Sequence, residues 1–234
     1  MQLSKTEDKI INELKRLNLE IFTIKDLKLI FKFGSVKSYN LIKALKRKNV
    51  IKKEKGYIVL KGTDQFVEGI SINSPSYISF WSALNYYGYS DQMPNKIFIA
   101  SVKYSRETES FKYVTLKSQK FFGYKSVGNI IIAEKEKAII DSLMFPKYAG
   151  GIREINESLK SALNDLNKSK LIDYAIKTKS KAVIRRLGFL LQVNGYNKTL
   201  RLKDKIGKGY EILDPSLKRS NNLNKEWMLD INTK

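Results

Sequence analysis

The sequence contains neither cysteine nor histidine among its 234 residues. The absence of cysteine excludes disulfide bonds and thiolate nucleophiles, and the absence of histidine removes the commonest general base. Together the two absences exclude nearly every zinc or haem site, because those sites use cysteine and histidine as ligands. We therefore expect no metal site, no cofactor and no catalytic residue.

Long apolar runs are missing as well. No segment reaches the ~18 uninterrupted apolar residues that a membrane-spanning helix needs. The opening residues, MQLSKTEDKII, are charged throughout and lack the apolar stretch of about 7 to 15 residues that marks a secretory signal. These features predict a cytoplasmic protein that has no membrane partner.

Basic residues are abundant, because 44 lysines and arginines oppose 23 acids and give a formal net charge of +21. Such an excess favours an anionic partner, above all nucleic acid, although ribosomal and membrane-surface proteins share it. Residues 1–62 hold 16 of the basic residues and 6 of the acids, a net charge of +10. This concentration favours DNA contact by the N-terminal segment.

The N-terminal segment is predicted to begin with three short helices. Two capping-box patterns, in which Ser or Thr is followed three residues later by an acid, predict helix starts at Ser4 and Thr23. Ser35 follows Gly34 and can cap a third amphipathic segment, SVKSYNLIKALKRK. If its apolar positions pack inward, its outer face is polar and basic. That outer face carries Lys37, Tyr39, Asn40, Lys43 and Arg47.

A hairpin is predicted to follow the third helix. Val50 and Ile51 begin one strand, residues 52–56 form a basic turn, and Tyr57 to Leu60 return as the second strand. Three helices and a hairpin within about 60 residues resemble the winged helix-turn-helix family. The resemblance implies that the third helix enters a major groove, while the hairpin contacts phosphates through Lys52, Lys53 and Lys55.

Two simpler interpretations of the basic helix stay open. The lysines and the arginine at positions 43, 46, 47 and 48 can solvate an exposed helix end and complement its dipole. Winged helices also serve as protein-docking modules, although such modules have less reason to place cations on both the third helix and the hairpin.

The remainder of the chain, residues 63–234, is predicted to be a mixed α and β domain. Pro75 and Ser76 are expected to open a helix that ends at Gly88. Apolar or alternating patterns predict strands at 96–100, 111–116, 120–124 and 129–133. Helices are expected at 134–145, 152–163, 171–176 and 182–193, and short segments at 210–213 and 227–231 as strands that complete or edge the sheet.

Several sequence segments of this second domain occur together in one known family. They are YISFWSALNYYGYSDQMPNKIFIAS (77–101), EKEKAIIDSLMFPKYAGGIREI (134–155), RRLGFLL (185–191) and LDPSLKRSNNLNKEWMLDIN (213–232). In this order they resemble AbiEi-type antitoxins of type IV toxin-antitoxin systems, which act in abortive infection and viral defence. The resemblance runs through nearly the whole chain, and PKYAGG and RRLGFLL are its most specific parts.

The family resemblance implies an α+β protein of two domains: a winged helix-turn-helix over residues 1–62 and an antitoxin domain over 63–234. It further implies a protein that represses its own operon by binding inverted repeats in the promoter, and that counteracts a nucleotidyltransferase toxin encoded alongside, with or without direct contact. The alternative is a winged-helix transcription regulator whose second domain is an unrelated interaction or effector-binding module.

Enzymatic interpretations are weaker. Glu134 to Lys137 follow an apolar run as in some metal-dependent nucleases, yet they are explained more simply as the first turn of a helix. A nucleotidyltransferase needs paired aspartates after a Gly-Ser turn, whereas Asp91, Asp141 and Asp165 are isolated. Gly150 and Gly151 suit a phosphate-binding turn, although such a pair more often only starts a helix.

Two further clusters have possible roles in nucleic-acid binding. The first, Tyr86, Tyr87, Tyr89, Phe121, Phe122 and Tyr124, would stack unpaired bases, although core packing explains most of it. The second is basic and would extend the DNA-binding surface or meet an acidic partner. It comprises Lys177, Lys179, Lys181, Arg185 and Arg186.

Overall fold

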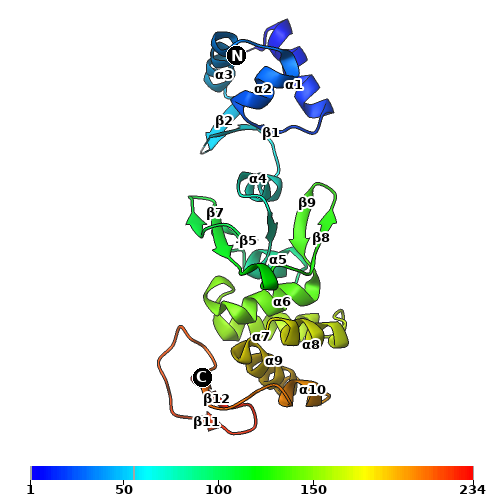
Figure 1. Ribbon diagram of the computed structural model, residues 1–234, viewed down its shortest axis with the longest axis vertical. Coiled ribbons are helices and arrows are strands. Elements are labelled where there is room, and N and C mark those ends of the chain that lie inside the picture. Colours follow the sequence, from blue (N-terminus) through cyan, green and yellow to red (C-terminus); the bar gives the residue numbers. More distant parts are fainter. Residues whose placement is uncertain (1, 55, 234) are drawn as a thin grey trace. The chain divides into compact units, whose positions relative to one another are not determined.

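The computed structural model describes residues 2–54 and 56–233 and divides into two compact units, Met1–Ile72 and Asn73–Lys234. Both units mix helices and strands, so the chain belongs to the α+β class that the sequence predicted (Figure 1). The helix at 65–72, beyond the boundary predicted at residue 62, belongs to the first unit. In the described ranges every helix falls short of the length and apolar character that a membrane crossing requires.

The first unit contains the three predicted helices and the hairpin, but the first strand of the hairpin is longer than predicted. Lys52, Lys53 and Glu54 were expected in a turn, and they pair with the second strand instead. Its elements are α1 (Lys5–Arg16), β1 (Ile21–Phe22), α2 (Ile24–Phe31), α3 (Ser35–Arg47), β2 (Ile51–Glu54), β3 (Tyr57–Leu60) and α4 (Gln65–Ile72). The capping boxes predicted at Ser4 and Thr23 are both formed, with Glu7 and Asp26 as the reciprocal partners. Strand β1 was not predicted, because two residues are too few for an alternating pattern. It joins the hairpin as an outer strand in the order β1-β3-β2.

One apolar core holds these elements together. Its buried residues come from all three leading helices, from β1 and from the hairpin: Ile10, Ile11, Leu14, Phe22, Leu27, Ile42, Leu45, Ile51, Ile58 and Leu60. Helix α3 contributes Ile42 and Leu45, so its opposite face is left toward solvent. The position of this exposed face is therefore fixed by the same core that stabilises the unit.

An ion pair also holds the end of α3. The Lys48 ammonium donates a hydrogen bond to a carboxylate oxygen of Glu7, in the first turn of α1. That bond, followed by the bond from the Ser4 backbone N–H, lowers the pKa of Glu7 to about 2. Because the pKa is lower in the folded state, the pair stabilises the fold above the ordinary Glu value and loses its effect as the pH falls toward 2.

Glu7→Gln should therefore reduce the hydrogen-exchange protection of the α1 and α3 amides at pH 6. Compared with the wild type at the same pH, the deficit should shrink progressively between pH 4.5 and about 2, since the wild type itself becomes protonated there. Lys48→Gln should produce a similar deficit at pH 6. A deficit that is equal at pH 6 and pH 2.5 would show that the charge of Glu7 does not act through this pair.

The second unit is built on a six-stranded mixed sheet. Its strands are β4 (Ser76–Ile78), β5 (Ile97–Ser101), β6 (Arg106–Glu107), β7 (Phe111–Thr115), β8 (Tyr124–Val127) and β9 (Ile130–Ala133). They are arranged in the order β6-β7-β5-β4-β9-β8, with β4 parallel to β9 and antiparallel to β5. The helices are α5 (Phe80–Tyr86), α6 (Lys135–Met144), α7 (Gly151–Ala162), α8 (Lys168–Lys177), α9 (Lys181–Val193) and α10 (Leu200–Lys203). Helix α6 contacts α5, α7, α8 and α9, and so lies at the centre of the helical layer (Figure 1).

Two predicted segments of this unit differ in the structure. Ser76–Ile78 is a strand near the middle of the sheet, and the helix expected from Pro75 begins at Phe80 instead. Pairing with β5 and β9 outweighs the helical pattern of the sequence there. The strand expected at 120–124 is displaced, because Ser118–Lys120 forms a 3₁₀ turn (η1) and β8 begins at Tyr124.

The C-terminal strands form a sheet of their own. Strands β10 (Glu211–Ile212), β11 (Leu223–Asn224) and β12 (Leu229–Asp230) pair in the order β10-β12-β11, so they do not extend the large sheet as predicted. Trp227 precedes β12 and is fully buried against α9 at Gly188, where an added Cβ would lie 2.0 Å from the indole ring. The glycine in RRLGFLL therefore provides the space into which this small sheet docks.

Candidate nucleic-acid interface

The outer face of α3 is a continuous exposed stripe. With 3.6 residues per turn, positions 36, 40, 43 and 47 lie on the side of the helix opposite the buried Ile42 and Leu45. This stripe of Val36, Asn40, Lys43 and Arg47 is named the α3 stripe below. It combines an apolar group, an amide and two cations on one helix face.

Three of the predicted contact residues lie on the stripe and a fourth flanks it. Asn40, Lys43 and Arg47 are exposed members of the stripe, and Tyr39 beside them is 56% exposed. Together with Ala44 and Lys46, the three stripe residues line a hollow in the surface of α3. Because alanine is small, the polar ends of the neighbouring side chains border open space.

Lys37 lies to the side of the stripe. Its Nζ atom stands 4.1 Å from the centroid of the Phe33 ring, in the connection between α2 and α3. A cation held over an aromatic face is less free to reach along the outer axis of the helix. The structure thus separates Lys37 from the other predicted contacts of this helix, although it remains exposed.

Sequence reasoning missed two residues of this surface. Val36 is 74% exposed in the first turn of α3 but was not among the predicted contacts. Lys46 lines the hollow with Asn40 and Arg47. The signal for Val36 was its spacing from positions 40, 43 and 47, because residues three or four apart lie on the same face of a helix. The same spacing predicted which residues of this helix face inward.

The two described lysines of the hairpin point to opposite faces of its sheet. Lys52 pairs across the strands with Val59, whereas Lys53 pairs with Ile58, and cross-strand partners share a face. Ile58 belongs to the core formed with α1 and α3, so Lys53 lies on the face of the sheet that packs against α1 and α3. Lys55, the third predicted hairpin contact, lies outside the described residues.

Lys52 already has an ionic partner. Its Nζ atom lies 2.7 Å from a carboxylate oxygen of Glu68 in α4, a side chain that is only 2% exposed. A buried carboxylate requires a counter-charge, so Lys52 neutralises Glu68 and joins the hairpin to α4. Of the two described lysines, Lys53 is the better placed to contact a phosphate.

The predicted basic surface of the second unit is not a cluster of five. Arg185 and Arg186 in α9 are 1% and 5% exposed, and both donate hydrogen bonds to backbone carbonyls. Arg185 binds the carbonyls of Ile206 and Lys208. Arg186 binds those of Leu143, Ile212 and Leu213. These arginines hold the C-terminal loops against α9, because guanidinium supplies several donors at once.

Only the lysines of that predicted cluster lie at the surface. Lys177, Lys179 and Lys181 are exposed, and the Lys177 ammonium stands 4.1 Å from the centroid of the Phe122 ring. The three remaining cations lie around the junction between α8 and α9. The basic surface is therefore smaller than the sequence suggested.

A buried polar network lies between the large sheet and α6. Lys137 and Asp141, one turn apart in α6 and both fully buried, form an ion pair. Tyr77 in β4 accepts a hydrogen bond from Lys137 and donates one to Asp141, and Ser79 also donates to Asp141. Burial and the nearby Asp141 charge raise the pKa of Tyr77 well above its usual range. Every polar group here has a partner, which is the pattern of a structural network.

The acids of the nuclease-like pattern are similarly engaged. Glu134 lies next to the Lys170 ammonium at 3.0 Å and accepts a hydrogen bond from the Tyr174 hydroxyl. Glu136 accepts a bond from the backbone N–H of Asn167. In the described part of the chain, no three acidic side chains converge as a metal site requires.

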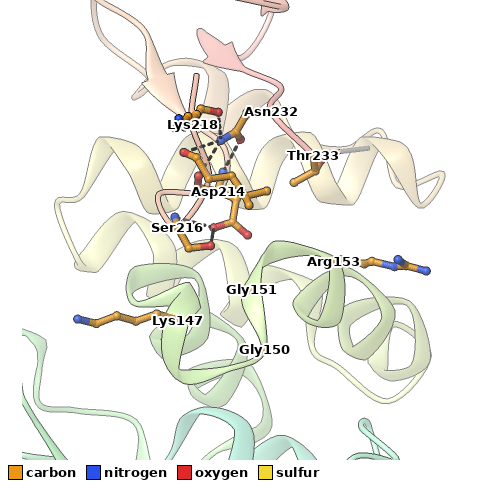
Figure 2. A pocket seen from close by; sticks show the side chains of 10 residues that line it. Lys147, Gly150, Gly151, Arg153, Asp214, Ser216, Lys218, Asn232 and Thr233 are labelled. Carbon is orange, nitrogen blue, oxygen red and sulfur yellow. Dashed lines mark hydrogen bonds between the residues drawn. The ribbon is translucent and has the colours of Figure 1, made fainter. Parts of the chain in front are cut away.

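The Gly150-Gly151 turn is closed by an acidic side chain (Figure 2). One carboxylate oxygen of Asp214 accepts a hydrogen bond from the Ile152 N–H at 2.9 Å, at the start of α7. The other accepts from Ser216, and Asn232 donates to the carbonyl of Asp214. Burial raises the pKa of Asp214, but these hydrogen bonds outweigh it and leave the pKa below its usual value. The positive end of α7 thus already holds an anion that belongs to the protein.

The aromatic cluster proposed for single strands is divided in the structure. Phe121 and Tyr124 pack with the buried Tyr77, and Tyr89 is 7% exposed and donates to Asp165. Tyr86 is 42% exposed. The rings therefore do not share one open platform, and core packing accounts for most of them.

Comparison with known proteins adds to the description of the fold. The sequence matches no family model and no curated protein. Its structure is similar to the crystal structure of the RV2827C protein from Mycobacterium tuberculosis, with a TM-score of 0.69 and 13% sequence identity. The similarity covers 97% of this chain and 92% of that one. At this identity the similarity concerns the fold alone, and it extends over both units.

Proposed function

We propose that the first unit binds duplex DNA in a sequence-specific manner, as a winged helix-turn-helix whose α3 helix enters the major groove. The observation that supports the proposal most strongly is the α3 stripe, where Asn40, Lys43 and Arg47 stand exposed side by side and opposite the core. Within the described residues, the amide of Asn40 has no hydrogen-bonding partner. It is free to bind a base edge.

The dimensions of α3 suit this role. An α-helix with its side chains is about 10 to 12 Å across, and the major groove of B-DNA is about 12 Å wide. The 13 residues of α3 extend about 20 Å along its axis. The helix is therefore long enough to place the stripe along several base pairs while its ends remain near the phosphates.

The polar side chains then have distinct roles. Asparagine can form two hydrogen bonds with the N6 and N7 atoms of adenine, and arginine or lysine can bind guanine or phosphate. We assign adenine contact to Asn40, contacts with guanine or phosphate to Lys43 and Arg47, and phosphate contact to Lys53. Lys52 is assigned to Glu68 and the stability of the hairpin.

Replacement of Asn40 and Lys53 should separate base recognition from phosphate contact. Asn40→Ala should relax the preference at one base pair by about 1 to 3 kcal/mol, and Lys53→Ala should weaken binding to all sequences and reduce the salt slope by about one unit. The measurement is fluorescence anisotropy over a range of salt concentrations, with duplexes selected from a random pool and with random DNA. Equal losses on selected and random DNA for both variants would contradict the proposal.

We further propose that the protein is an antitoxin that represses its own operon at promoter inverted repeats and counteracts a nucleotidyltransferase toxin. This proposal is supported by the family resemblance of residues 77–101, 134–155, 185–191 and 213–232. Co-expression with a nucleotidyltransferase encoded in the adjacent reading frame should restore growth that the enzyme alone arrests. If growth stays arrested while the promoter is still repressed, the protein is instead a transcription regulator whose second unit has an unrelated role.

A further inference from the structure

The α3 stripe contains one residue whose exposure the polar contacts do not explain. Val36 lies in the first turn of α3 and is 74% exposed, although its side chain is entirely apolar. It stands one helical turn before Asn40 on the same face. Exposed apolar side chains are ordinary when scattered, but this one is aligned with three groups suited to DNA.

We infer that Val36 reads the C5-methyl group of a thymine in the bound DNA, which makes it a specificity-determining residue of the α3 stripe. The inference rests on the proposed DNA binding. In the major groove, thymine presents the only methyl group among the four bases, and apolar side chains recognise it by contact. A valine that is otherwise in water gains free energy when it covers such a group.

The spacing of the stripe limits where the thymine lies. Four residues of α-helix advance about 6 Å along the axis, and one base pair of B-DNA advances about 3.4 Å. Val36 and Asn40 therefore contact bases within about two base pairs of each other. Together they define a site in which a thymine lies next to, or one pair removed from, the adenine that Asn40 binds.

The charge around Val36 favours nucleic acid over a protein partner. The rest of the stripe is Asn40, Lys43 and Arg47, with Lys46 at its border, and no acid occurs within α3. A protein that covered Val36 would also have to desolvate or neutralise these cations, whereas the phosphates of a duplex neutralise them directly.

The test removes one methyl group at a time from the DNA. The full-length protein first selects duplexes from a random pool, and each thymine of the enriched sequence is then replaced in turn by deoxyuridine, which lacks only the C5-methyl group. With the wild type, one position should lose affinity about fourfold, the factor that corresponds to burial of about one methyl group. With Val36→Ala, the loss at this position should vanish, while losses at other thymines stay unchanged.

Two controls define the outcome. Val36→Thr keeps one methyl group of nearly the same shape and should retain most of the sensitivity at that position, and circular dichroism should show that both variants remain folded. Identical deoxyuridine profiles for the wild type and Val36→Ala would overturn the role of Val36 but leave the proposed DNA binding in place. A selection that enriches no sequence would overturn the proposed function itself, and with it this inference.

Discussion

Arg186→Ala is expected to lower the free energy of unfolding of the second unit by about 3 to 5 kcal/mol. The guanidinium donates to the carbonyls of Leu143, Ile212 and Leu213, and the residue is 5% exposed. Alanine leaves these carbonyls without a donor in a region that water reaches poorly, and each unsatisfied buried group costs about 1 to 3 kcal/mol. The C-terminal strands should therefore separate from α9 before the rest of the unit unfolds.

The measurement is urea unfolding of the whole chain, followed by tryptophan fluorescence. Both tryptophans, Trp81 and Trp227, belong to the second unit, so their emission reports its unfolding. Arg153→Ala is the matched control, because Arg153 is exposed on α7 and should change stability by no more than about 0.5 kcal/mol. An equally small effect of Arg186→Ala would show that the guanidinium is not what holds these carbonyls.

Asp141→Ala should destabilise the second unit by a similar amount, about 3 to 5 kcal/mol, for a different reason. Asp141 is the counter-ion of the fully buried Lys137, and it also accepts hydrogen bonds from Tyr77 and Ser79. Its removal leaves a positive charge in the core, for which the described residues then supply only the Tyr77 hydroxyl as a hydrogen-bond acceptor. The expected readout is a lower urea midpoint in the same fluorescence experiment.

The double variant Lys137→Met and Asp141→Leu distinguishes an uncompensated charge from a packing defect. When both partners of a buried ion pair are replaced by apolar residues of similar size, the change in stability is often close to zero. We expect the double variant to recover most of the stability that Asp141→Ala loses. If the double variant is as unstable as the single one, the shape of the core rather than its charge governs this region.

These effects matter for function because α6 and α9 organise the second unit. Lys137 and Asp141 fasten α6 to strand β4, and Arg186 joins α9 to the C-terminal strands. Both groups lie in the segments 134–155 and 185–191, on which the proposed antitoxin role rests. The buried charges of Lys137, Asp141 and Arg186 therefore serve the fold.

Local patterns in the sequence predicted the three leading helices and the hairpin of the first unit. The capping boxes at Ser4 and Thr23, the spacing of Ile42 and Leu45, and the return of the chain after Glu54 each concern residues that are close along the chain. Interactions of this kind are decided by backbone geometry and by the helical period, so they can be read from the order of residues. The same period also defined the outward face to which Asn40, Lys43 and Arg47 belong.

Long-range contacts decided what the sequence alone did not determine. Ser76–Ile78 became a strand because β5 and β9 lie on either side of it, and Arg186 became buried because the chain returns at Ile212 and Leu213. Lys52 forms an ion pair with Glu68 of α4 that the sequence did not predict. The charge of a residue determines only which kinds of group it can bind. Which partner it meets depends on segments far away in the sequence, and only the tertiary structure brings those together.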